Sequence, residues 1–76
     1  MDKEKIYKII AEVLCIDPDR VIPEANFRRN LGADSLDLIQ LMMVCEETFD
    51  IEINDNDVSH INTVQDIFDY AEKIGL

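Results

Sequence analysis

The chain has 76 residues, of which 47% are hydrophobic, and a formal net charge of −10. This length predicts a single domain over residues 1–76, and the hydrophobic share argues against a disordered chain. The charge argues against nucleic acid and anionic membranes as partners. Because no apolar run approaches the roughly 20 residues that cross a bilayer and the polar start does not resemble a signal peptide, we expect a cytoplasmic protein without a membrane segment.

The first predicted helix covers about residues 3–15, with Asp2 as its N-cap. Its apolar residues recur at helical spacing and form one stripe. The stripe consists of Ile6, Ile9, Ile10, Val13 and Leu14. Residues 17–33 are predicted to form a long loop, because Pro18 interrupts the helical pattern and Pro23 breaks the chain again. The apolar residues expected to hold this loop to the core are Val21, Ile22, Phe27 and Leu31.

The second predicted helix covers about residues 34–50 and has two apolar faces. Asp34 and Asp37 resemble a capping box at its start and complement the positive end of the helix dipole. The face expected to pack against the core comprises Leu38, Leu41, Met42, Cys45 and Phe49. The second face comprises Leu36, Ile39 and Met43. A helix that is apolar on two sides in so small a chain indicates that one face binds a partner.

A short third helix is predicted over residues 56–61 and a fourth over residues 64–74. Thr63 and Asp66 resemble a capping box before the fourth helix, and Gly75 fits the stop after it. The apolar stripe of this helix comprises Val64, Ile67, Phe68, Ala71 and Ile74. Strand signals are weak throughout. The predicted fold class is therefore all-α, a four-helix bundle with a short third helix and a long loop between helices 1 and 2.

The negative charge is concentrated in one part of the chain. Residues 30–72 contain eleven Asp and Glu residues and no Lys or Arg, whereas the rest of the chain has six acidic and seven basic residues. Without interleaved cations, these acids cannot form the usual ion pairs along a helix. We interpret the segment as a docking surface that attracts basic partners.

Ser35, at the predicted start of the second helix, is the candidate for modification. Because Asp34 fits the N-cap position, the Ser35 hydroxyl is not needed there and can point outward. The free N–H groups of a helix start also favour a phosphate. A catalytic serine needs an activating base, and the single histidine is His60. A hydrolase therefore ranks last, and we expect no catalytic residue.

No metal site or disulfide is expected. Residues 55–66 begin like a calcium-binding loop, but the sixth position is His60 where the sharp turn needs glycine. Cys15 and Cys45 are flanked by apolar residues, and small disulfide-stapled domains contain more cysteines. Both are expected to be buried, reduced thiols.

Three segments carry a family resemblance. Residues 31–37 read Leu-Gly-Ala-Asp-Ser-Leu-Asp, residues 46–53 read Glu-Glu-Thr-Phe-Asp-Ile-Glu-Ile, and residues 61–66 read Ile-Asn-Thr-Val-Gln-Asp. Together with the length, the charge and the helix order, they resemble an acyl carrier protein of bacterial type II fatty-acid synthesis. The resemblance extends from Ile6 to about Ile74.

The resemblance implies that Ser35 receives 4′-phosphopantetheine from coenzyme A through a magnesium-dependent holo-synthase, a phosphopantetheinyl transferase. The thiol of this arm would carry acyl groups as thioesters between enzymes of fatty-acid biosynthesis, and the protein, a monomer, would not itself be an enzyme. The residues that would meet basic patches on partner enzymes are Asp34, Leu36, Asp37, Ile39, Met43, Glu46 and Glu47. The residues that would line an acyl cavity are Leu38, Leu41, Met42, Cys45, Phe49, Ile61 and Ile67.

The chain departs from the family pattern at several positions. Gln40 stands where fatty-acid carriers usually have an acid, and residues 28–30 read Arg-Arg-Asn where apolar or acidic residues are common. Leu38 and Cys45 also replace the usual residues. A specialised carrier for polyketide, nonribosomal peptide or other acyl or aminoacyl transfer therefore stays open. The alternative of another class is a non-covalent acidic adaptor, which carries nothing.

Overall fold

The structure is a computed structural model that describes residues 2–76. Its helices are α1 (Lys3–Leu14), the 3₁₀-helix η1 (Pro18–Arg20), α2 (Ser35–Phe49), α3 (Asp55–Val58) and α4 (Val64–Lys73). Within the described residues there is no strand, and an isolated bridge pairs Asn26 with Thr63. The prediction of an all-α fold with a short third helix is confirmed.

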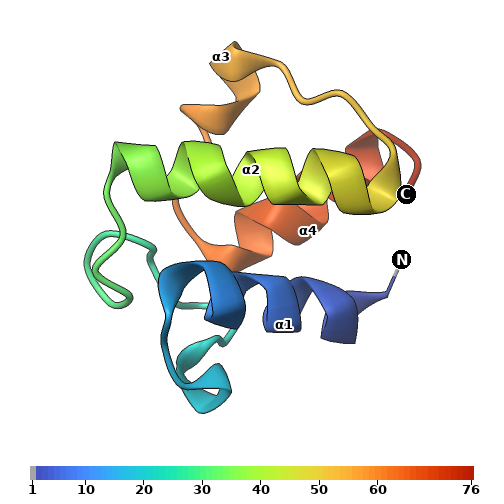
Figure 1. Ribbon diagram of the computed structural model, residues 1–76. Coiled ribbons are helices and arrows are strands. Elements are labelled where there is room, and N and C mark those ends of the chain that lie inside the picture. Colours follow the sequence, from blue (N-terminus) through green and yellow to red (C-terminus); the bar gives the residue numbers. More distant parts are fainter. Residues whose placement is uncertain (1) are drawn as a thin grey trace.

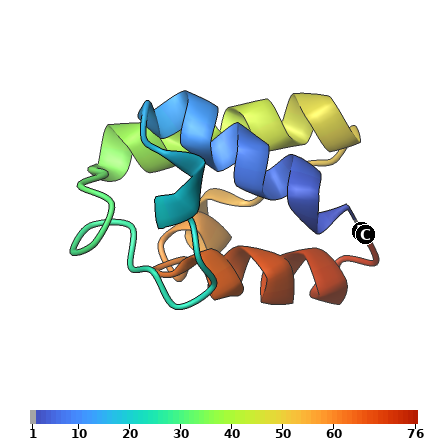
Figure 2. The ribbon, with the colours of Figure 1, turned by 90° about the horizontal axis from the view of Figure 1, so that it is seen from below.

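The helices form a bundle around one core (Figure 1). α1 and α2 lie side by side and run in opposite directions, and α4 runs in the same direction as α2 (Figures 1 and 2). Tyr7 of α1 and Phe68 of α4 meet edge to face with ring centroids 5.3 Å apart. The short helix α3 contacts α2 and lies across it from α1 (Figure 1). α1 and α3 thus lie on opposite sides of α2, and the long loop lies at the end where α2 begins (Figure 1).

Side-chain caps define where the helices begin, as predicted from the sequence. Asp2 Oδ1 accepts a hydrogen bond from the backbone N–H of Lys5 at 3.1 Å. The capping box of α2 is complete, because Asp34 Oδ1 accepts from the Asp37 N–H at 2.9 Å and Asp37 Oδ2 accepts from the Asp34 N–H at 3.1 Å. The box of Thr63 and Asp66 before α4 is complete as well. These bonds satisfy backbone donors that a helix start otherwise leaves free.

Several helix boundaries differ from the prediction by one to three residues. α1 ends at Leu14 because Cys15 adopts the left-handed conformation with φ of 54°. α3 begins at Asp55, because the Asn54 side chain accepts from the Asn56 N–H at 2.9 Å. It ends at Val58 rather than residue 61, since the Ile61 N–H donates to the Val58 carbonyl three residues back, which tightens the turn.

The loop between α1 and α2 is held to the start of α4 by backbone hydrogen bonds. Phe27 N–H donates to the Asn62 carbonyl at 2.9 Å, and the Val64 N–H donates to the Ala25 carbonyl at 3.1 Å. Phe27 is fully buried. The loop also contains η1, which was not predicted because a three-residue turn has no periodicity. The loop is therefore a fixed support for the start of α2.

The core consists of most of the predicted stripe residues together with loop residues. Val13, Leu14 and Phe49 are only partly buried, and Ile74 is 39% exposed because it lies past the last turn of α4. Val21, Phe27 and Leu31 are buried as predicted, but Ile22 is 49% exposed. The prediction for Ile22 was wrong because the backbone at Val21 is extended, so neighbouring side chains point to opposite sides. Cys45 is buried as predicted, whereas Cys15 is exposed, because it lies past the last turn of α1 as its C-cap.

Candidate functional site

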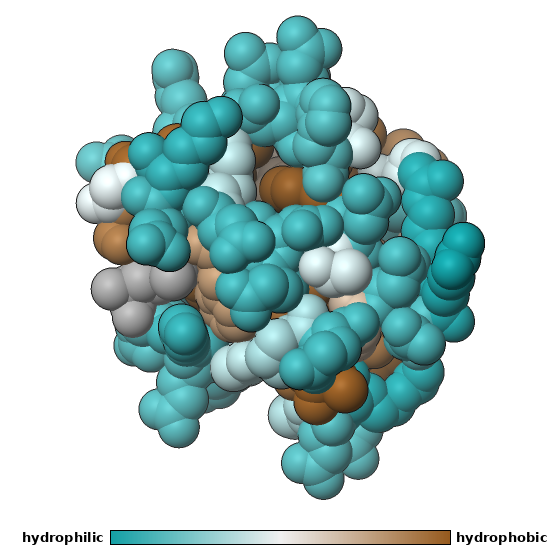
Figure 3. Space-filling model, turned by 180° about the vertical axis from the view of Figure 1, so that it is seen from behind, coloured by the Kyte–Doolittle hydropathy of each residue, from teal (hydrophilic) through white to brown (hydrophobic). Residues whose placement is uncertain are grey.

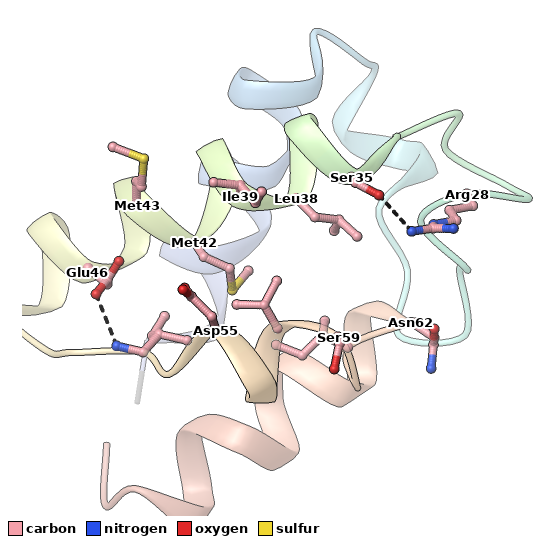
Figure 4. Close-up of a pocket in the computed structure, with 13 residues that line it drawn as sticks. Arg28, Ser35, Leu38, Ile39, Met42, Met43, Glu46, Asp55, Ser59 and Asn62 are labelled. Atoms are coloured by element: carbon pink, nitrogen blue, oxygen red, sulfur yellow. Dashed lines mark hydrogen bonds between the residues drawn. The ribbon is translucent and has the colours of Figure 1, made fainter.

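Ser35 is the first residue of α2, and its side chain is exposed. The capping box leaves its hydroxyl free of any capping role, as expected from the sequence. Arg28 Nη2 donates a hydrogen bond to Ser35 Oγ at 2.9 Å (Figure 4). The hydroxyl thus lies beside a cation and at the positive end of the α2 dipole, where negative charge is stabilised.

The second apolar face of α2 is exposed to solvent. The exposed fractions are 74% for Leu36, 50% for Ile39 and 57% for Met43. The core face is buried at Leu38 and Met42. The sequence-based assignment of two faces to α2 is therefore confirmed, and the exposed face runs along the helix from the turn that contains Ser35.

The acids of this region have different roles within the fold. Asp34 and Asp37 hold the first turn of α2 through the capping box. Glu46 Oε2 accepts from the Ile53 N–H at 3.0 Å, which fixes the chain just before α3 (Figure 4). Glu47 is exposed. Three of the four acids expected to dock a partner therefore also have structural roles.

A cavity of about 530 Å³ lies between α2 and α3 and begins at Ser35 and Arg28 (Figure 4). Leu38 and Met42 point into it from α2, and polar side chains of Asp55, Ser59 and Asn62 lie along its rim. Its complete lining is Arg28, Ser35, Leu38, Ile39, Met42, Met43, Glu46, Ile53, Asp55, Val58, Ser59, Ile61 and Asn62. Seven of these residues are apolar and six are polar or charged. The volume lies in the range of small-molecule sites.

A much smaller apolar cavity of about 20 Å³ lies among α1, α2 and α4. Met42, Ile53 and Ile61 line both cavities and so separate them. The residues predicted to line an acyl cavity are divided between the two cavities. Leu38 lines the larger one, and Cys45, Phe49 and Ile67 line the smaller one. Met42 and Ile61 line both. Leu41 lines neither, because it is fully buried in the core.

His60 is not placed to activate Ser35. Its Nδ1 lies 2.8 Å from the Asn56 carbonyl oxygen and 3.4 Å from Ser59 Oγ, whereas the hydrogen-bond partner of Ser35 is Arg28. Over residues 2–76 no group of three or more His, Cys, Asp or Glu side chains is arranged to hold a metal ion. The geometry at Ser35 is therefore a hydroxyl beside a cavity, with Arg28 rather than His60 as its hydrogen-bond partner.

Several cavity residues were not predicted from the sequence. Ile53, Val58, Ser59 and Asn62 enter the cavity because α3 and its flanking turns fold against α2. Their sequence pattern is too short to show a face. Arg28 had one signal, its departure from the family pattern, but nothing in the sequence placed its guanidinium at Ser35.

The face opposite to that of Figure 1 is mostly hydrophilic, and its apolar atoms emerge in separate patches (Figure 3). In the part of the chain that the structure describes, no helix combines the length and apolarity that a membrane span requires.

Comparison with known proteins agrees with this geometry. Residues 4–71 match the family model described as phosphopantetheine attachment site. The chain is 52% identical over 71 residues to the acyl carrier protein of Bdellovibrio bacteriovorus, covering 93% of this chain and 91% of the relative. It is 54% identical over 69 residues to that of Syntrophobacter fumaroxidans, covering 91% of this chain and 85% of the relative.

A solved structure from Mycobacterium tuberculosis, described as an acyl carrier protein, has the same fold. It superposes with a TM-score of 0.87 at 32% sequence identity and covers 95% of this chain and 96% of its own. The chain therefore belongs to the acyl carrier proteins, which are carriers rather than enzymes and hold acyl groups on a 4′-phosphopantetheine prosthetic group.

Proposed function

We propose that Ser35 is the attachment residue for 4′-phosphopantetheine, and that residues 1–76 act as one carrier domain for acyl chains in fatty-acid biosynthesis. The observation that carries the proposal is the position of the Ser35 hydroxyl. It is exposed, lies at the start of α2, and opens onto the cavity between α2 and α3. These features fit the group, because the phosphate meets a helix start and a cation while the arm has an adjacent cavity.

In the attachment step, Ser35 Oγ forms a bond to the phosphorus that bears the pantetheine half of coenzyme A. The pyrophosphate bond breaks, the adenosine bisphosphate half leaves, and the hydroxyl proton passes to a base of the transferase. The chain itself supplies the hydroxyl and its surroundings. The prosthetic group supplies a thiol, which carries acyl groups as thioesters.

We assign the acyl chain to the cavity between α2 and α3. Leu38, Met42 and Ile61 present apolar surface there, and Ile53 and Val58 extend it toward α3. Methionine is adaptable in shape, so Met42 is the side chain best suited to move when a longer chain reaches the smaller cavity behind it. Burial of the acyl chain would remove its methylene groups from water.

We assign partner docking to the exposed face of α2. Leu36, Ile39 and Met43 supply apolar contact area, and the surrounding acids attract the Arg and Lys residues of the transferase and of acyl-processing enzymes. Such acids are Asp34, Asp37, Glu46 and Glu47. This arrangement favours fast and reversible association, which suits a monomeric carrier that works in the cytoplasm, where its coenzyme A donor is made.

The test is intact-protein mass after incubation with coenzyme A, magnesium and a broad-specificity phosphopantetheinyl transferase. We expect the wild type to gain the mass of one phosphopantetheine and Ser35→Ala to gain nothing. Ser59→Ala is the matched control, because Ser59 is another exposed serine at the same cavity and should leave modification unchanged.

Absence of a mass gain in the folded wild type, beside a carrier that is modified, would favour the non-covalent adaptor. Modification of Ser35→Ala would move the attachment site elsewhere. For the protein isolated from its host, the mass of the bound acyl group distinguishes a fatty-acid carrier from a carrier of polyketide or aminoacyl groups.

A further inference from the structure

The side chain of Arg28 reaches Ser35 from a different part of the chain. Arg28 lies in the loop before α2, and its Nη2 donates to Ser35 Oγ at 2.9 Å while the side chain lines the mouth of the cavity (Figure 4). Residues 30–72 contain no Lys or Arg, so α2 and α3 contribute no cation of their own. Arg28 is therefore the cation that the fold places at the hydroxyl.

The backbone around Arg28 is held in place, so its position is a feature of the fold. The Arg28 N–H donates to Asn26 Oδ1 at 3.0 Å, and the Asn30 N–H donates to the Asn26 carbonyl at 2.9 Å. The preceding residue, Phe27, is fully buried. On the other side, the Ala33 N–H donates to the Phe27 carbonyl at 2.8 Å. Arg28 thus extends from a pinned turn toward the start of α2.

A phosphodiester at Ser35 would meet opposing charges. Asp34 and Asp37 are held beside it by the capping box, and their negative charges repel an added phosphate. The dipole of α2 partly offsets this repulsion. The Arg28 guanidinium adds a full positive charge on the side where the cavity begins. It also presents N–H donors in a planar fork that matches phosphate oxygens.

We propose that Arg28 binds the phosphodiester of the prosthetic group and thereby orients the arm toward the cavity between α2 and α3. The proposal depends on attachment at Ser35. After attachment, Ser35 Oγ is bonded to phosphorus, and the non-bridging oxygens are two bonds from the atom that the guanidinium already contacts. Arg28 is thus a positioning residue for the arm.

The experiment compares the holo forms of the wild type, Arg28→Gln, Arg28→Lys and Arg29→Gln. Arg29 is the matched control, because it is the neighbouring exposed arginine. Intact mass and Ser35→Ala first establish that each protein is loaded at Ser35. We expect the Nε–H signal of Arg28 to shift between the apo and holo wild type while that of Arg29 stays in place. We expect the ³¹P signal to change in Arg28→Gln and to superpose on wild type in Arg29→Gln.

Relaxation of the isotope-labelled pantetheine amides gives the second readout. A more mobile arm in Arg28→Gln, with Arg28→Lys between it and the wild type, supports the proposal, because Lys keeps the charge and loses the fork. If the variants load normally but the Arg28 signal does not shift and the ³¹P spectra superpose, Arg28 does not bind the phosphodiester and the attachment at Ser35 still stands. If the folded wild type is not loaded at all, both proposals fail.

Discussion

Ser35 and Cys45 of α2 both carry nucleophilic atoms, and their surroundings differ. Ser35 Oγ is exposed beside Arg28, whereas the Cys45 thiol is buried and lines the smaller cavity. Burial, and then the negative charge of Glu46, raise the pKa of Cys45 from its ordinary value of 9.0 to about 11. With this raised pKa, Cys45 stays protonated near neutral pH. The thiolate, which is the reactive form of cysteine, is therefore scarce at this position. A thioester bound close to it is thereby protected from attack by this residue.

The raised pKa of Cys45 predicts a pH-dependent stability. Between pH 9 and about 11 the folded state keeps the thiol proton, whereas the unfolded state releases it. The contribution of Cys45 to the free energy of unfolding is therefore complete below pH 9 and is lost as the pH rises from 9 to about 11. A pKa difference of this size corresponds to a loss of about 2–3 kcal/mol. We expect urea unfolding of the wild type to show a steeper loss of stability over this range than that of Cys45→Ala.

Cys15→Ala is the control, because Cys15 is exposed. This substitution should leave the dependence of the free energy of unfolding on pH as in the wild type. Equal slopes for the wild type and Cys45→Ala would show that the buried thiol does not contribute.

At the level of the helices, the parts of the structure set by local sequence were predicted correctly. Asp34 with Asp37, and Thr63 with Asp66, form capping boxes because each pair interacts over three residues. The two apolar faces of α2 follow from helical periodicity alone. The bounds of α3 and the exposure of Ile22 depend on how distant segments pack, and a four-residue helix has no stripe of its own.

The candidate site also has a part that local sequence predicts and a part that depends on how distant segments pack. The position of Ser35 followed from the caps, whereas the guanidinium of Arg28 reaches it through a turn fixed by Asn26 and Asn62. The division between two cavities at Met42 depends on contacts between α2 and α3, which sequence spacing does not encode.

The cavity between α2 and α3 predicts that acylation stabilises the fold. Each methylene group that enters it contributes about 0.8 kcal/mol, so the free energy of unfolding should rise from butyryl to decanoyl forms until the cavity is filled. A larger, stiffer side chain at Met42 should close the way to the smaller cavity. We therefore expect the rise in the free energy of unfolding to level off at a shorter acyl chain in Met42→Phe than in the wild type. Urea unfolding of each acyl form measures this rise.

Leu36→Phe is the control, because Leu36 is exposed and lines neither cavity. It should reproduce the wild-type dependence on chain length. A free energy of unfolding that does not change with acyl length would place the chain outside the bundle.

At the level of the whole molecule, function and stability place opposite demands on the charges. The last turn of α2 contains Glu46 and Glu47 and no basic residue, although this is the negative end of the helix dipole. Asp50 and Glu52 add further negative charge just beyond it. This charge attracts basic partners, but it repels itself within the folded chain. The docking surface is therefore expected to lower the stability of the bundle.

The last prediction is that salt stabilises the protein. Screening shortens the range of repulsion from roughly 10 Å at 0.1 M to 3 Å at 1 M ionic strength. A relief of this repulsion by about 1 kcal/mol raises the Tm of a domain of this size by about 4–8 °C.

Glu47→Gln combined with Glu52→Gln should raise the Tm at low salt and reduce its dependence on salt, because both acids are exposed in the acidic segment. Glu24→Gln, an exposed acid outside that segment, is the control and should change neither. Thermal melts of the three proteins over a series of sodium chloride concentrations measure the effect, and parallel curves for all three would show that repulsion within residues 30–72 does not limit stability.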